Sequence, residues 1–173
     1  MKKNNKGFTL LELIVIIAIL AVVVGLAVVS LSPILSTAAK QAAVTAKSKI
    51  YQCKTDCLAK DADKTCLVLS NDEGYLVATY YEGDLTTELS SEKLTNRKAI
   101  LTYGGTELSE GQKLFINFNK STGSVKRFGV ASELSDVPEA DSSSNCDLTI
   151  TSGITTYELR IDPVTGVCKL KKQ

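Results

Sequence analysis

The chain has 173 residues, of which 44% are hydrophobic and 23% are charged, with 20 Lys and Arg side chains against 19 Asp and Glu. This even balance gives no indication of a nucleic-acid-binding surface. The chain contains no histidine and no glycine-rich phosphate loop, which removes the usual base for a Ser or Cys nucleophile and a common nucleotide site. We therefore expect a protein that is not an enzyme and that uses no cofactor.

The first element is a short basic head followed by a long apolar run. Three lysines precede or adjoin Gly7, and residues 13–29 are all Leu, Ile, Val, Ala or Gly. A helix of this length can cross a bilayer, and the basic head predicts a cytoplasmic N-terminus with everything after the run exported. Glu12 is the one acid at the edge of the run, and a carboxylate in that setting needs a partner.

The hydrophobic pattern continues beyond the apolar run as an amphipathic helix. Apolar residues recur at alternating steps of four and three, at Leu35, Ala39, Ala43, Ala46, Ile50, Cys53 and Cys57. We expect one helix of about fifty residues, roughly 75 Å long, whose second half packs on a domain. Pro33, with Gly25 ahead of it, predicts a kink or a locally melted stretch around residues 25–33.

After about Ala59 the chain becomes polar and rich in turn and strand residues, which predicts a globular head. Residues 90–98 fit a short helix, and residues 136–145 fit a surface loop. Strand patterns fall at residues 66–70, 75–82, 99–103, 113–119, 125–131, 157–161 and 167–170. The predicted fold class is α+β: a long N-terminal helix, kinked near Pro33, packed on a single small antiparallel β-sheet.

The segment Lys6-Gly7-Phe8-Thr9-Leu10-Leu11-Glu12, followed by the apolar run, resembles the leader and N-terminal helix of type IV pilins and pseudopilins. The resemblance covers about the first thirty residues. It implies cleavage by a prepilin peptidase between Gly7 and Phe8, N-methylation of Phe8, and pairing of Glu12 with the Phe8 amine of a neighbouring subunit. Such a pair offsets the desolvation of both charges and fixes the stagger of adjacent helices. The alternative is a signal anchor whose Glu12 lies at the membrane interface.

The resemblance also implies an organisation and a set of partners. Residues 1–7 would be the leader, 8–58 the helix (8–35 transmembrane and filament core, 36–58 amphipathic) and 59–173 the exported head. The precursor would be a single-pass membrane protein, and the mature subunit would join a helical surface filament of its own copies. Its partners would be the prepilin peptidase and an inner-membrane assembly platform. The alternative role is a minor pilin or pseudopilin of a type II secretion or DNA-uptake fibre.

All five cysteines fall in the part expected to be exported, which indicates disulfides. Cys146 and Cys168 bracket the C-terminal segment, and closing that loop would contribute roughly 3 kcal/mol; many pilins close a C-terminal loop in a similar way. Cys66 could pair with Cys57 or Cys53, leaving one thiol over. Alternatively, Cys53 and Cys57 are buried thiols of the apolar stripe. With no histidine to complete a ligand set, we expect no structural metal site.

Removal of residues 1–7 leaves 17 of the 20 basic side chains against 19 acids, so the mature chain is mildly acidic. Six basic side chains remain as candidates for a local basic patch, with a solvated face as the alternative: Lys120, Lys126, Arg127, Lys169, Lys171 and Lys172.

Overall fold

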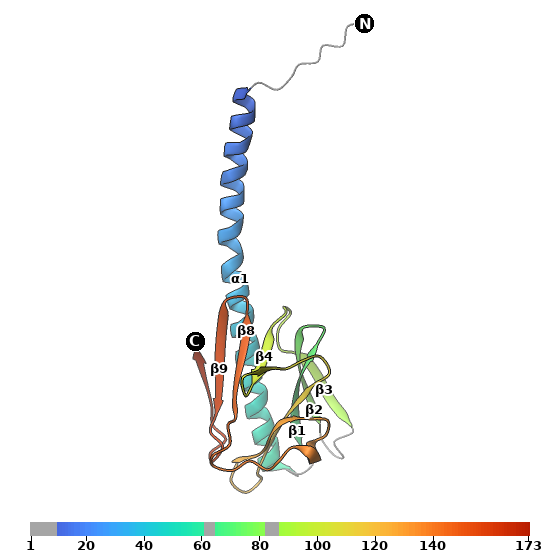
Figure 1. Ribbon diagram of the computed structural model, residues 1–173. Coiled ribbons are helices and arrows are strands. Elements are labelled where there is room, and N and C mark those ends of the chain that lie inside the picture. Colours follow the sequence, from blue (N-terminus) through green and yellow to red (C-terminus); the bar gives the residue numbers. More distant parts are fainter. Residues whose placement is uncertain (1–9, 61–64, 82–86) are drawn as a thin grey trace. The chain divides into compact units, whose positions relative to one another are not determined.

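The computed structural model describes residues 10–60, 65–81 and 87–173, without the side chains of residues 26–36. One long helix is followed by strands that form two antiparallel sheets (Figure 1). The predicted α+β class is confirmed. The chain divides into two compact units, Met1–Ile34 and Leu35–Gln173.

The helix α1 spans Leu10–Ala59, in agreement with the rod expected from the hydrophobic pattern. Its second half buries the predicted stripe, and Ala39, Ala43, Ala46, Ile50, Cys53 and Cys57 are all fully buried. The last helical hydrogen bond joins the Lys60 amide to the Asp56 carbonyl at 2.8 Å. The backbone is helical through Gly25 and Pro33, and the kink expected there stays a prediction.

The head contains two five-stranded sheets, so the expectation of a single sheet was wrong. Sheet A has the order β3-β2-β1-β6-β7, and sheet B has the order β10-β9-β8-β4-β5. The strands of sheet A are β1 (Cys66–Asp72), β2 (Tyr75–Tyr81), β3 (Glu88–Lys93), β6 (Lys113–Phe118) and β7 (Val125–Ala131). Those of sheet B are β4 (Ile100–Tyr103), β5 (Thr106–Glu107), β8 (Asp147–Ser152), β9 (Thr155–Ile161) and β10 (Cys168–Lys172). A short 3₁₀ helix, η2, spans Leu134–Asp136.

The strand β3 replaces the short helix expected over residues 90–98, so that prediction was also wrong. All six residues of β3 are exposed, and it forms an edge of sheet A against β2. An edge strand with neither face buried carries no alternation of apolar residues, and the run Glu-Leu-Ser-Ser-Glu-Lys has none. The pairing of β3 with β2 brings the hydroxyls of Ser91 and Thr79 within hydrogen-bond distance, 3.1 Å apart. The strand β8 was missed as well, although Leu148 and Ile150 alternate there as buried residues.

Both sheets share one hydrophobic core with the second half of α1. Sheet A contributes residues such as Leu67 and Ile116, which face each other across the β1–β6 ladder. Sheet B contributes Ile150 and Leu159 among others. Figure 1 shows β8 and β9 beside the second half of α1. The helical stripe is therefore a structural part of the head.

The β1–β2 turn is a tight hairpin turn at residues 71–74. Glu73 and Gly74 have φ of 52° and 85°, the left-handed pair that a two-residue type I′ turn requires. The side-chain oxygen of Asn71 accepts a hydrogen bond from the Gly74 amide at 2.9 Å. The turn fixes the register in which Asp72 faces Tyr75.

Candidate assembly surface

The first part of α1 exposes its apolar side chains on all sides. Between Leu10 and Val24, twelve Leu, Ile and Val side chains are 45–78% exposed. Glu12 lies in the first helical turn, where the partial positive charge of the helix N-terminus stabilises a carboxylate. Gly7 and Phe8, the expected cleavage and methylation positions, lie outside the described residues. The pairing of Glu12 with Phe8 stays a prediction.

Within the described residues, no helical segment combines the length and the hydropathy that a bilayer span requires. Residues 8 and 9, and the side chains of residues 26–35, belong to the span predicted over 8–35 and lie outside the described part of the chain.

The second half of α1 carries an exposed apolar row in addition to its buried stripe. Val44, Tyr51 and Leu58 are seven residues apart, so they lie on one face of the helix, and they are 49%, 37% and 43% exposed. The stripe predicted from the sequence was the buried one, with alternating steps of four and three; a search for apolar residues seven apart would also have found this row.

Two hydrogen bonds place the β9–β10 turn beside this row. The Tyr51 hydroxyl donates to the Cys168 carbonyl at 3.1 Å, and the Lys54 amine donates to the Thr165 carbonyl at 2.7 Å. Val164 and Val167 of that turn are 57% and 38% exposed. We call the five residues Val44, Tyr51, Leu58, Val164 and Val167 the helix–turn strip.

Two polar contacts attach the second half of α1 to β2 and β3 of sheet A. The Lys49 amine lies 2.8 Å from the Glu92 carboxylate of β3. The Tyr80 hydroxyl of β2 donates to the Asp56 carboxylate at 2.8 Å. Burial, together with nearby thiols and this carboxylate, raises the pKa of Tyr80 well above its usual range. Tyr80 therefore stays neutral and remains a hydrogen-bond donor to α1.

The five cysteines are buried thiols, and they lie in three settings. Cys53 and Cys57 occupy the buried stripe of α1, where their sulfurs donate to the carbonyls of Ile116 and Thr65. Burial raises the pKa of Cys53, whereas the neighbouring Cys53 thiol lowers the pKa of Cys57. Cys66 packs with a second cluster, formed by Val68, Phe115, Leu134 and Val137, and burial raises its pKa to about 12.

This arrangement bears on the predicted pairing of Cys66. In β1, Leu67 belongs to the core that contains α1, and Cys66 belongs to the second cluster. Successive side chains of a strand point to opposite faces, which agrees with the placement of Leu67 and Cys66 in different clusters. The Cys57 thiol is nevertheless near enough to contribute to the raised pKa of Cys66, and a disulfide from Cys66 to either helical cysteine stays a prediction.

Cys146 and Cys168 flank the end of β9. Cys168 pairs with Ile161, and Cys146 precedes Asp147, which pairs with Arg160. Two strand spacings are about 9.6 Å, more than the roughly 4.4–6.8 Å between the Cα atoms of a disulfide. A Cys146–Cys168 bridge therefore requires the chain before β8 to cross the end of β9. Burial raises the pKa of both thiols to about 11, and the bridge stays a prediction.

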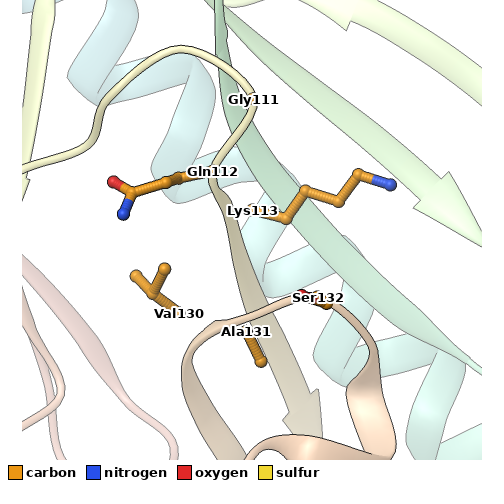
Figure 2. A pocket seen from close by; sticks show the side chains of 6 residues that line it. All are labelled: Gly111, Gln112, Lys113, Val130, Ala131 and Ser132. Atoms are coloured by element: carbon orange, nitrogen blue, oxygen red, sulfur yellow. The ribbon is translucent and has the colours of Figure 1, made fainter.

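One hollow of about 490 Å³ opens where β6 begins and β7 ends. Six residues line it: Gly111, Gln112, Lys113, Val130, Ala131 and Ser132. Figure 2 shows the Gln112 and Lys113 side chains pointing away from each other. Polar groups that converge on one point are what an enzyme site needs, and this lining does not provide them.

One residue of the expected basic patch, Arg127, binds backbone carbonyls of a neighbouring loop. The Arg127 guanidinium donates to the carbonyls of Leu134, Ser135 and Val137 at 3.2, 3.0 and 2.6 Å. These bonds hold the segment around η2 against β7. Arg127 thus serves to fasten a loop, and the remaining lysines lie on exposed or half-buried positions.

Comparison with known proteins finds one family model that matches the chain. It describes the prokaryotic N-terminal methylation motif and covers residues 2–28. This motif is the leader signal of type IV pilins and pseudopilins, so the predicted resemblance is confirmed and the chain carries such a leader. No curated protein and no solved structure matches the chain.

Proposed function

We propose that the chain is the precursor of a structural subunit of a type IV pilus. In this proposal a prepilin peptidase cleaves after Gly7, Phe8 is N-methylated, and the mature subunit moves from the membrane into a helical surface filament through an inner-membrane assembly platform. The N-terminus of the precursor is cytoplasmic and the head is exported. The methylation motif over residues 2–28 supports the proposal.

The observation that carries the proposal is the exposed apolar segment of α1. Fully burying a Leu, Ile or Val side chain contributes about 1.5–3 kcal/mol, so covering twelve side chains that are roughly half exposed contributes about 10–20 kcal/mol. Lipid can cover this surface before assembly, and copies of the same helix can cover it afterwards. A filament of its own copies is thus a favourable state for the subunit.

The helix–turn strip supports the same proposal from the head. Its helical members, Val44, Tyr51 and Leu58, form an exposed apolar row on the second half of α1. Exposed apolar side chains that group on one surface are typical of a contact with another protein. In the proposed filament the strip lies against α1 of a neighbouring subunit.

Glu12 is the residue that tests the proposal. Glu12→Ala removes the carboxylate that would pair with the Phe8 amine, and we expect normal cleavage and membrane insertion but few filaments. Glu110→Ala, at an exposed position in the head, is the matched control and should assemble normally. Processing is measured by the mass of the membrane-bound subunit, and assembly by the amount in sheared surface fibres. Normal filament yield from the Glu12 variant would refute the pairing.

The methylation motif is shared by pilins and pseudopilins, so a minor pilin or a pseudopilin of a secretion or DNA-uptake fibre is the second candidate. The two roles differ in stoichiometry. The chain should be the most abundant protein of sheared fibres if it is a major pilin. Fibres that contain it only as a trace component would establish the second candidate.

A further inference from the structure

The β6–β7 turn contains the one Asn-x-Ser/Thr sequence of the whole chain, at Asn119-Lys120-Ser121. This tripeptide is the acceptor sequence for attachment of a glycan to the asparagine amide, and a usable acceptor lies on an exposed loop of an exported protein. Lys120 and Ser121 are exposed, and Asn119 is half-buried where the strand ends. The tripeptide therefore has the acceptor sequence and lies in a turn at the surface of the head.

The turn also arranges the amide for reaction. The side-chain oxygen of Asn119 accepts two hydrogen bonds from Ser121, one from its amide at 3.1 Å and one from its hydroxyl at 2.9 Å. Both donors draw electron density toward the amide oxygen, which makes the protons on the amide nitrogen Nδ2 more acidic. Since the oxygen is held by Ser121, Nδ2 is the end of the amide that remains for a reaction partner.

The backbone around Asn119 is held in place independently of its side chain. The backbone N–H of Asn119 donates to the Ser124 carbonyl at 2.8 Å, and the backbone N–H of Gly123 donates to the backbone carbonyl of Asn119 at 2.9 Å. The acceptor tripeptide is thus presented on a closed turn at the end of a hairpin. Asn119 lies beyond Phe118, the last paired residue of β6, so a glycan on its side chain replaces no residue pair of the β6–β7 ladder.

We propose that Asn119 is an N-glycosylation site of the exported head. The donor is a lipid-pyrophosphate-linked oligosaccharide, and the catalyst is a membrane oligosaccharyltransferase. In the step, Nδ2 attacks the anomeric carbon of the first sugar, the new C–N bond forms, and the bond from that carbon to the pyrophosphate oxygen breaks. The lipid pyrophosphate leaves with the bonding electron pair, and one Nδ2 proton passes to a base of the transferase. The site rests on the proposed function, because the transfer takes place on the exported side.

The test is intact-mass measurement and peptide mapping of the full chain recovered from the cells that produce it. We expect a glycan mass on the peptide that contains Asn119, and complete loss of that mass in Asn119→Gln and Ser121→Ala. Ser121→Thr keeps a hydroxyl and should retain the modification, which separates a chemical role of the hydroxyl from a change in the turn. Asn96→Gln is the matched control, because Asn96 is exposed but is followed by Arg97 and Lys98.

Export is measured in the same cells by adding protease from outside. An exported head whose Asn119 peptide has its unmodified mass would overturn the glycosylation site and leave the proposed function standing. A head that is protected inside the cell would overturn the proposed function itself. Retention of the glycan in Ser121→Ala would overturn the role assigned to the Ser121 hydroxyl and, with it, the acceptor sequence.

Discussion

Replacement of Ile50 by alanine tests whether the second half of α1 is part of the core of the head. Ile50 is fully buried on α1 in the cluster that both sheets share. Truncating a buried Ile to Ala costs about 2–5 kcal/mol, because transfer free energy is lost and a cavity is left. A single domain is stabilised by only about 5–15 kcal/mol, so this loss is a large fraction of the total.

The assay is urea unfolding of the full chain in detergent micelles, followed by circular dichroism. With a slope of about 1–3 kcal/mol per molar urea, the midpoint should fall by roughly 1–3 M in Ile50→Ala. Leu58→Ala is the matched control, since Leu58 is on the same helix but 43% exposed, and its midpoint should change far less. Equal shifts in the two variants would refute the packing of this helical face.

Two further predictions concern the head. Gly166→Ala should destabilise the head by about 3 kcal/mol or more, because Gly166 has φ of 63° and an added Cβ would collide with the Gly123 carbonyl and approach Phe118. Gly105→Ala is the control: Gly105 also has positive φ but has open space around it, so this variant should cost only about 1 kcal/mol. Equal unfolding midpoints in the two variants would contradict this account. In reduced protein, stability should fall as pH rises from about 8.5 to 11, because Cys146 and Cys168 have a folded pKa of about 11, above that of the unfolded thiol. A thiol whose pKa is raised in the folded state stabilises the fold at any pH below the pKa of the unfolded thiol, and this stability, about 3 kcal/mol per thiol, is lost as the pH rises to the pKa of the folded thiol. The measurement is the midpoint of urea unfolding at each pH. A midpoint that does not change across this range would contradict the burial of the two thiols.

The sequence was most informative where one physical rule acts along a single element. The alternation of steps of four and three predicted the buried stripe of α1, because a helix turns by a fixed angle per residue. Runs of strand-favouring residues bounded by turn residues predicted seven of the strands: β1, β2, β4, β6, β7, β9 and β10. The leader motif was found from residue identity alone, and the family comparison confirms it.

The sequence failed where structure depends on contacts between distant segments. The split into two sheets depends on which strands pair, and no local pattern in residues 94–99 marks the first of the points at which the chain passes from one sheet to the other. The edge strand β3 buries neither face, so its sequence carries no strand period. From the sequence, Arg127 was expected in a surface basic patch, because nothing local shows that its guanidinium binds the carbonyls of the η2 segment. The positions of the cysteines across sheet faces likewise followed only from the register.

The central claim is that the trimmed apolar helix assembles into a filament of its own copies. The most direct test is mass spectrometry of the protein in fibres sheared from the cell surface. The account predicts a chain that lacks residues 1–7 and begins with N-methylated Phe8, as an integral component of those fibres. Surface fibres that lack this chain, or a chain that retains its leader and stays in the membrane while the assembly machinery is present, would contradict it.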